Sequence, residues 1–217
     1  MMADRPHVEL LEKNQPRQER AKRTYEAILA AAAELLVEVG VERISTNLIA
    51  ERAGITVPAL YRYFPNKYSV LHALGAKLMD RQNEVADAWF QGHSGQSDPR
   101  QLLVDIYPLL KMAYEVTLEQ PGGLEIIQSL RAVAPLQELR LASHRLVAER
   151  FACLLMEVMD AAAGETLALQ ARLSIDMGYD VVEMALEERS LPPYDILREG
   201  ARMIEQYWRA ILDEQSG

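Results

Sequence analysis

Residues 56–63 combine small side chains with two tyrosines. The side chains that we expect to face outward are Thr56, Val57, Pro58, Ala59, Tyr61 and Tyr63. Small side chains allow a helix to approach the major groove of DNA, the methyl groups of Val57 and Ala59 suit a thymine methyl, and tyrosine hydroxyls suit phosphate oxygens. These residue types therefore favour contact with DNA. Short helices joined by a glycine turn also occur in helical proteins that do not bind DNA, and that alternative stays open here.

Two short helices are expected to position this segment, over residues 46–53 and 57–63. Ser45 and Thr56 stand where N-cap residues stand, and Gly54 between the helices suits a tight turn. Ala50 is small enough for the two helices to cross closely. The pattern predicts a helix-turn-helix, because a steep crossing requires both a small contact residue and a sharp turn.

Apolar residues at helical spacing predict a first helix that Gly40 closes, and Asn66 is placed to cap a long fourth helix to about residue 90. Further helices are expected at about 100–118, 123–133, 136–162, 165–190 and 193–213, with a kink at Pro108. No segment alternates with period two as a strand would. We predict an all-α fold of about nine helices.

Three regions are expected along the chain. Residues 1–16 are expected to form a flexible tail. Residues 17–66 are expected to form a three-helix DNA-binding domain of the helix-turn-helix type, and residues 67–217 a helical body for ligand binding and dimerisation. Residues 1–67 hold 10 Lys and Arg against 9 Asp and Glu, although the whole chain of 217 residues has a net charge of −9. The acidic excess therefore lies in the body, and the N-terminal part is compatible with a nucleic-acid partner.

The chain has no apolar run long enough to cross a membrane and no secretion signal at its start, so a cytoplasmic protein without a membrane partner is expected. Its one cysteine, Cys153, has apolar neighbours and is expected in the core. Neither a cofactor nor a metal site is predicted. Asp176, Asp180 and Glu183 share a helical spacing that would suit a metal, but a solvated helix face explains them better.

A more specific signal is a set of short motifs that resembles the TetR (tetracycline repressor) family of bacterial regulators. The motifs are Ala27-Ile28-Leu29-Ala30-Ala31-Ala32 with Gly40, then Ser45-Thr46, Ile49-Ala50, Ala53-Gly54-Ile55, Leu60-Tyr61 and Tyr63-Phe64-Pro65-Asn66-Lys67. The likeness covers about residues 20–75. The rest of the chain resembles the family only in length and in its number of helices.

The resemblance implies a homodimeric transcriptional regulator, expected to be a repressor, that binds a palindromic DNA operator and is released by a small-molecule effector. Carried over by position, the residues that look like phosphate contacts are Thr46, Tyr61, Lys67 and, further, Tyr63. The residues that would face the bases are Asn47, Thr56, Val57, Pro58 and Ala59. An asparagine such as Asn47 is able to make a bidentate contact to adenine.

Two positions depart from the family pattern. Pro58 stands where many members have glycine, and Tyr68 follows Lys67 where glutamate is usual. Proline is tolerated in the first turn of a helix, so Pro58 is expected to stiffen the second short helix without breaking it. Tyr68 weakens the match slightly.

The last two predicted helices carry apolar residues on more than one side, which favours burial on two sides. The predicted dimer interface, four helices with two from each subunit, contains Val182, Met184, Leu186, Ile204, Tyr207, Trp208 and Ile211. The alternative is that these residues complete the core of one subunit.

A ligand pocket is expected within the body. Its candidate residues are Trp89, Tyr107, Met112, Tyr114, Ile127, Arg131, His144, Phe151, Met156 and Met177. Methionines and aromatic residues at helical spacing also build ordinary cores. His144 is polar within a mostly apolar helix and would also suit a surface or boundary position, and Arg131 would suit either an acidic effector or plain solvent exposure.

An enzyme and a protein-interaction module are the two alternatives to a DNA-binding regulator. An enzyme is not expected, because the chain has no phosphate-binding glycine loop, no His-Glu-x-x-His zinc pattern and no nucleophile elbow. A helical protein-interaction module, or a regulator without a small-molecule ligand, remains the alternative. Steep loss of DNA binding with added salt would separate a DNA-binding protein from an interaction module.

Overall fold

The described part of the chain consists of helices and the turns that join them in this computed structural model, which describes residues 9–10, 18–95, 98, 100–159 and 164–216. It contains ten α-helices and one 3₁₀ turn and no strand, so the predicted all-α fold is confirmed. Packing divides the chain into two compact units, residues 1–79 with 120–140 and residues 80–119 with 141–217. This division cuts α4 and α8 and does not fall between residues 66 and 67. The predicted tail over residues 1–16 lies largely outside the described residues.

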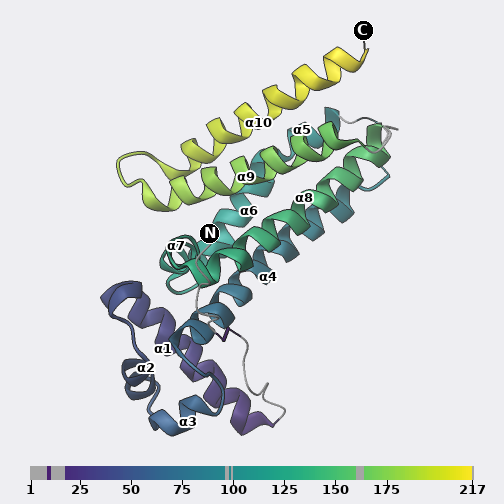
Figure 1. Cartoon of the computed structure of the whole chain (residues 1–217). Helices are drawn as coiled ribbons and strands as arrows, with labels where there is room; N and C mark the ends of the chain where they lie inside the picture. The colour runs from purple at the N-terminus through teal and green to yellow at the C-terminus, as the bar shows by residue number, and fades with distance from the viewer. Residues whose placement is uncertain (1–8, 11–17, 96–97, 99, 160–163, 217) are drawn as a thin grey trace, which may run out of the picture. The chain divides into compact units, whose positions relative to one another are not determined.

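The first unit is built on α1 (Glu19–Arg43), which packs against α2 (Thr46–Arg52) and α7 (Gly123–Ala132). The five-residue α3 (Val57–Tyr61) packs on α2, and Figure 1 shows α1, α2 and α3 as neighbours. The unit also holds the start of α4 (Lys67–His93) and the 3₁₀ turn Ala134–Leu136. Gly40, which was expected to close the first helix, lies inside α1 at a kink with a positive φ of 73°, and the helix continues beyond it to Arg43.

The start of α4 is capped as predicted. The backbone N–H of Ser69 donates to Asn66 Oδ1 at 3.0 Å, and the Ser69 hydroxyl donates to the Asn66 carbonyl at 2.7 Å. These bonds satisfy groups that a helix end otherwise leaves without partners. They fix the residue at which the chain turns from the helix-turn-helix into the long helix.

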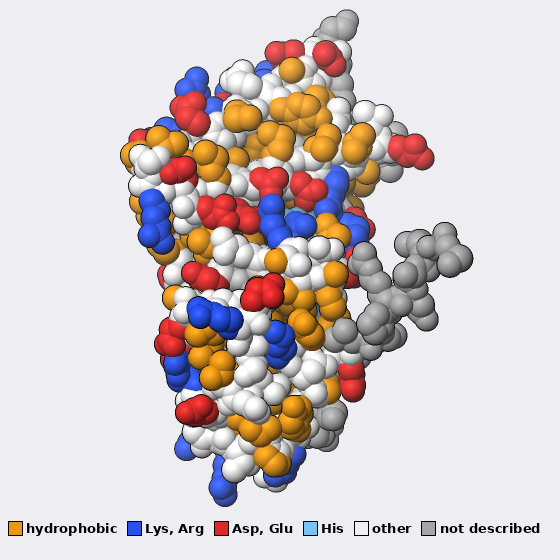
Figure 2. All heavy atoms as spheres, turned by 60° about the vertical axis from the view of Figure 1, so that its left-hand side comes forward, with side chains coloured by type: hydrophobic (Ala, Val, Ile, Leu, Met, Phe, Trp, Pro, Cys, Tyr) orange, Lys and Arg blue, Asp and Glu red, His pale blue; other side chains and the backbone are white. Residues whose placement is uncertain are grey.

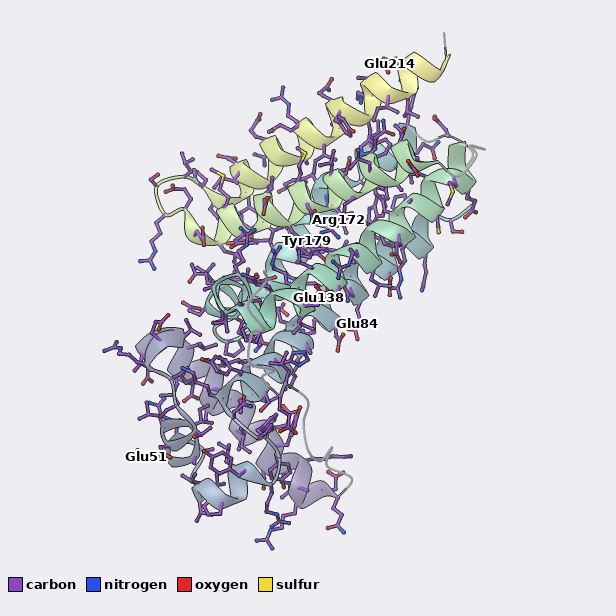
Figure 3. The ribbon with its side chains drawn as sticks, viewed as in Figure 1. Glu51, Glu84, Glu138, Arg172, Tyr179 and Glu214 are labelled. Carbon is purple, nitrogen blue, oxygen red and sulfur yellow. The ribbon has the colours of Figure 1, made fainter. Side chains whose placement is uncertain are left out.

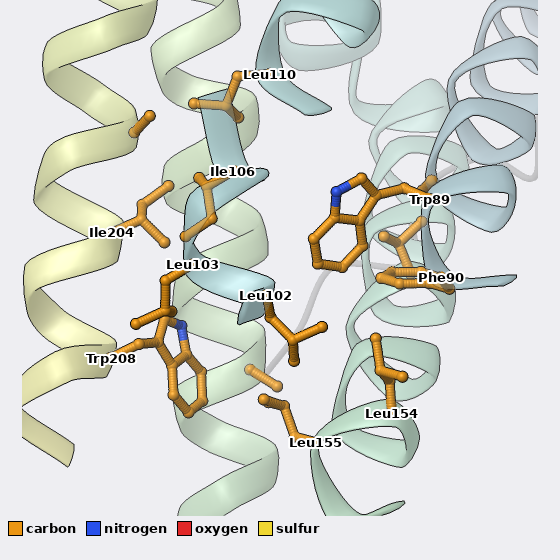
Figure 4. Close-up of a cluster of buried hydrophobic side chains, with 14 of the residues drawn as sticks. Trp89, Phe90, Leu102, Leu103, Ile106, Leu110, Leu154, Leu155, Ile204 and Trp208 are labelled. Atoms are coloured by element: carbon orange, nitrogen blue, oxygen red, sulfur yellow. The ribbon is translucent and has the colours of Figure 1, made fainter. Parts of the chain in front are cut away.

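The second unit contains the rest of α4 with α5 (Arg100–Val104), α6 (Ile106–Glu119), most of α8 (Gln137–Met159), α9 (Glu165–Glu187) and α10 (Pro193–Ser216). Helices α6, α9 and α10 pack against one another. Figure 4 shows how their core is filled by side chains that come from α4, α5, α6, α8 and α10, with Trp89 and Trp208 as its largest members. A core assembled from so many helices depends on contacts between residues far apart in the chain.

Two expectations change in this unit. The helix predicted at 100–118 is two helices, α5 and α6, because the ring of Pro108 clashes with the carbonyl four residues earlier, at Val104, and the helix breaks between them. Cys153 is exposed and does not lie in the core, because its side of α8 faces solvent although its neighbours are apolar.

None of the helices in the described residues is both long enough and apolar enough to cross a membrane.

Candidate nucleic-acid interface and internal cavity

The turn between α2 and α3 is held by capping groups at both helix starts. Ser45 Oγ accepts a hydrogen bond from the N–H of Leu48 at 3.3 Å, and Thr56 Oγ1 accepts one from the N–H of Ala59 at 3.4 Å. Gly54 between them has a φ of 66°, a conformation that residues with a Cβ rarely adopt. These features give the predicted helix-turn-helix a fixed crossing.

Beneath the two short helices lies an apolar layer. Ile49, Leu60 and Phe64 are fully buried in it. The ring of Tyr25 on α1 stacks on Phe64 at 5.3 Å between ring centroids and meets Tyr63 edge-on at 6.4 Å. The layer fixes α3 on α1, so the side chains on the outer side of α3 have a rigid support.

The predicted DNA contacts lie at the outer side of α2 and α3. The exposed ones are Asn47, Thr56, Pro58 and Tyr61, and the half-buried ones are Thr46, Val57, Ala59, Tyr63 and Lys67. A hydrogen bond of 3.2 Å joins the Thr46 hydroxyl to the Tyr61 hydroxyl. That bond brings the start of α2 next to the end of α3, so two of the expected phosphate contacts form one polar site.

Lys67 has a structural role in addition to the expected one. Its Nζ donates to the carbonyls of Val41 and Ile44, each at 3.2 Å, and lies 5.4 Å from the centroid of the Tyr68 ring. A lysine ammonium has three N–H donors, so two bonds to the chain leave one for a phosphate oxygen. Tyr68, one of the departures from the family pattern, contacts this ammonium through its ring.

An ion cluster between α1 and α2 was not expected. The guanidinium of Arg52 donates to Glu38 at 2.8 and 2.6 Å and to Glu34 at 3.1 Å. The Arg52 guanidinium holds the pKa of Glu38 below its usual value, and the two glutamates raise the pKa of Arg52 further. Glu34 and Glu38 are one helical turn apart on α1, but Arg52 lies on α2, 14 residues beyond Glu38, so no local spacing reveals the cluster.

Most of the residues predicted at the dimer interface lie inside the protomer. Val182, Ile204, Trp208 and Ile211 are each at most 9% exposed. These four are corrected to core positions, because the sides of α9 and α10 that carry them pack on the other helices of the unit. Leu186 and Tyr207 are half-buried against the same core and Met184 is 48% exposed, so these three stay predicted interface positions.

Other apolar side chains on the same two helices face outward. Leu169, Leu173, Met184 and Met203 are between 48% and 61% exposed. Figure 2 shows hydrophobic side chains gathered in its upper part, the level at which α9 and α10 lie in Figure 1. We call these four residues the outer apolar face; exposed apolar patches of this kind are typical of interaction surfaces.

The second unit contains an apolar cavity of about 80 Å³. Its walls come from α4, α6, α8, α9 and α10, and include Gln82, Trp89, Ile106, Phe151, Tyr179 and Ile204. Of the ten residues predicted for the pocket, Trp89 and Phe151 line it.

The other eight predicted pocket residues lie elsewhere. Tyr107, Met156 and Met177 pack against the core outside the cavity walls, Tyr114 is buried beside Tyr194, and Met112 is 39% exposed. Ile127 and Arg131 belong to the first unit, where Arg131 is exposed. His144 is buried behind Tyr179. Helical spacing identifies a buried side but not which buried side chains border an empty space, so it did not separate these eight residues from the cavity walls.

His144 belongs to a polar network between α8 and α9. Its Nδ1 lies 2.8 Å from Asp176 Oδ1, and its ring stacks on Tyr179 at 3.9 Å between centroids. Arg172 donates to the other oxygen of Asp176 at 2.7 Å; Figure 3 shows Arg172 and Tyr179 leaving α9 on the side of α8. Asp176 is thus part of an ion pair, and no group of metal-ligating residues occurs in the described residues.

The sequence reasoning missed Gln82 and Tyr179 as cavity residues. A signal for Gln82 was present, because it occupies the buried stripe of α4 that also holds Leu78, Ala86 and Trp89. A polar residue on such a stripe indicates a specific buried partner or site.

Comparison with protein families matches residues 28–74 to the family described as bacterial regulatory proteins, tetR family. The tetracycline repressor protein of class C from Escherichia coli is 44% identical over 54 residues, which is 25% of this chain and 25% of that protein. The chain thus aligns with about a quarter of the length of this repressor.

Solved structures resemble the chain over most of its length. SmeT, described as the repressor of the Stenotrophomonas maltophilia multidrug efflux pump SmeDEF, is 24% identical with a TM-score of 0.66, and the match covers 88% of this chain and 92% of SmeT. A complex of SmeT with triclosan matches at 23% identity and a TM-score of 0.62, covering 86% and 90% of the two chains. These likenesses show a common fold.

Proposed function

We propose that this chain, a member of the TetR family of bacterial regulatory proteins by its N-terminal domain and its fold, is a transcriptional repressor controlled by a small molecule. It binds a palindromic DNA operator as a homodimer and leaves the operator when an effector enters the cavity. The observation that carries the proposal is the capped helix-turn-helix, with Asn47, Thr56 and Pro58 exposed above a rigid apolar layer.

In the proposed complex, α3 enters the major groove of one operator half-site. Thr56, Val57, Pro58 and Ala59 lie at the start of that helix, the end by which a recognition helix reads base edges. The paired hydroxyls of Thr46 and Tyr61 and the remaining N–H of Lys67 bind phosphates on either side. Asn47, exposed at the start of α2, contacts a base.

The proposed dimer forms through α9 and α10. The outer apolar face gives a second copy a hydrophobic surface, and removal of such side chains from water favours association. Replacement of Leu173 by glutamate is expected to shift the protein from dimer to monomer in light scattering. Leu118, also exposed but on α6, provides the matched control, since Leu118→Glu is expected to leave the dimer unchanged.

The proposed control by ligand uses α4. This helix begins at Lys67, beside the helix-turn-helix, and farther along carries the cavity residues Gln82 and Trp89. An effector that binds better to one arrangement of the body shifts the population toward it. The two recognition helices then no longer match half-sites spaced by about one turn of DNA, 34–36 Å. The complex of SmeT with triclosan supports a small molecule as effector.

The experiment that tests the proposal is selection of bound duplexes from a random DNA library by the purified protein at two salt concentrations. We expect a palindromic sequence and a steep fall of affinity with salt, because bound phosphates release counterions. A folded dimer that enriches no sequence, or that binds DNA without dependence on salt, would overturn the proposal in favour of a protein-interaction module.

A further inference from the structure

The walls of the cavity carry no charge. Three polar side chains, Gln82, Ser174 and Tyr179, interrupt an otherwise hydrophobic lining that holds no acidic or basic residue. Burial raises the pKa of the Tyr179 phenol to about 12, so this group also stays neutral at physiological pH. A charged ligand would lose its hydration here without gaining a counter-charge, so the cavity favours a neutral one.

Two of the three polar side chains are already satisfied. The Ser174 hydroxyl donates to the Gln170 carbonyl at 2.9 Å and accepts from Trp208 Nε1 at 2.8 Å. The Ser143 side chain neighbours the Tyr179 phenol, and no buried atom of Tyr179 lacks a hydrogen-bond partner in the described part of the chain. Neither residue therefore needs a ligand to complete its hydrogen bonds.

Gln82 differs, because its side chain is held from one end only. The residue is 2% exposed, and its Nε2 donates to Thr117 Oγ1 at 2.7 Å. Thr117 uses its own hydroxyl proton to donate to the Ala113 carbonyl at 2.8 Å, so it accepts from Gln82. This direction of bonding fixes which end of the amide is nitrogen.

The opposite end of the amide, Gln82 Oε1, is buried and has no hydrogen-bond donor in the described part of the chain. Buried carbonyl oxygens are normally paired, since leaving one without a donor costs free energy. Gln82 is a wall residue of the cavity, and although Oε1 itself is covered, a shift of the amide or its neighbours would bring this oxygen within reach of a donor on a bound molecule.

We propose that the effector is a neutral, mainly apolar small molecule with a single essential hydrogen-bond donor, a hydroxyl or N–H group, that donates to Gln82 Oε1. This inference rests on the proposed function, because it specifies the ligand of the proposed effector site. The cavity of about 80 Å³ is smaller than the 300–1,000 Å³ typical of ligand pockets, so half-buried wall residues such as Leu109 and Phe151 move to admit a larger molecule.

The test compares three single-ring probes that differ at one position: 4-ethylphenol, which donates a hydrogen bond; 4-ethylanisole, which only accepts one; and 4-ethyltoluene, which does neither. Binding to the full-length dimer is measured by titration calorimetry. We expect 4-ethylphenol to bind about tenfold more tightly than either analogue, the scale of one buried hydrogen bond.

The variant Gln82→Met removes the acceptor and retains a flexible side chain of similar length. We expect it to abolish the preference for 4-ethylphenol and to leave the affinity for 4-ethyltoluene unchanged or higher. Its melting temperature without ligand should not fall, because the substitution also removes an unsatisfied buried oxygen. The control Gln101→Met changes an exposed glutamine on α5 and should retain the preference.

Equal affinities of the wild-type protein for the three probes, or no binding of any, would overturn the inference, as would a preference that survives in Gln82→Met. If the variant does not fold, the wild-type comparison decides alone. Operator binding is measured separately with each probe at saturation. If the wild-type protein prefers 4-ethylphenol but its operator affinity does not change, the result would contradict control of DNA binding by the ligand. The role of Gln82 as the hydrogen-bond acceptor for a bound ligand would still be supported.

Discussion

The helix-turn-helix and the cavity differ in where their polar and apolar side chains lie. Residues 46–67 place polar and small side chains on the outside of two short helices, over a buried apolar layer. The cavity is lined by apolar side chains from five helices. Among the buried polar atoms of its wall residues, only Gln82 Oε1 has no hydrogen-bond partner in the described part of the chain. The first surface is suited to a large polar partner and the second to a small apolar one.

The difference also concerns how each site is supported. The helix-turn-helix surface is held by local bonds, such as the caps at Ser45 and Thr56. The cavity exists only when α4, α6, α8, α9 and α10 are packed together. Trp208 supports two of its wall residues, since it packs edge-on against Phe151 and donates to Ser174. A change in the core of the second unit should therefore affect the cavity more than the helix-turn-helix.

The largest expected effect follows from Trp208→Ala. Trp208 is 1% exposed, packs edge-on against Phe151 and donates to Ser174, so its truncation should lower the free energy of unfolding by about 3–5 kcal/mol. Urea unfolding gives the loss. Hydrogen exchange should show weaker protection in residues 80–119 and 141–214 and little change in residues 28–64.

Tyr207→Ala, at the half-buried neighbouring position, is the control and should cost much less. Equal loss of protection in both units would show that they unfold as one and would break the comparison. If Trp208→Ala weakened the dimer but left the free energy of unfolding unchanged, Trp208 would lie at the dimer interface, as the sequence analysis predicted.

A second prediction concerns the outward groups of the helix-turn-helix. Asn47→Ala should lower discrimination at one base pair of the operator by about 1–3 kcal/mol, because a bidentate contact to a base is lost. Tyr61→Phe removes a hydroxyl that bonds Thr46 and is expected to meet a phosphate, so it should weaken binding to all sequences alike. Competition with a set of single-base operator variants measures both. Uniform weakening by Asn47→Ala would remove its assigned role in reading bases.

The smallest effect is expected from the ion cluster between α1 and α2. Arg52 lowers the pKa of Glu38 in the folded protein, so the pair contributes stability above the unfolded pKa of this carboxyl, and the contribution disappears as pH falls through the lowered value. Glu38→Gln should therefore melt slightly below the wild type at pH 7 and equally at strongly acidic pH. The effect is small because both side chains are substantially exposed. A difference in melting temperature that does not depend on pH would contradict this assignment.

The helix-turn-helix was predictable because its signals are local. The caps Ser45, Thr56 and Asn66 and the positive φ of Gly54 each depend on residues a few positions away, and the structure has them as expected. The cavity walls and the protomer core were not predictable from spacing. Periodicity indicates that Trp208 is buried, but whether another helix of the same chain or a second chain covers it depends on how the helices pack.

The dependence of the cavity on Gln82 has an evolutionary consequence. Both glutamine codons become leucine codons through one change of the middle base, and leucine would remove the unpaired acceptor from the wall. Under the proposed function, a single nucleotide change at this position would let the protein accept ligands without a donor, while residues 46–67, which are proposed to read the operator, stay the same. The chemical signal would then be able to diverge faster than the DNA sequence that is bound.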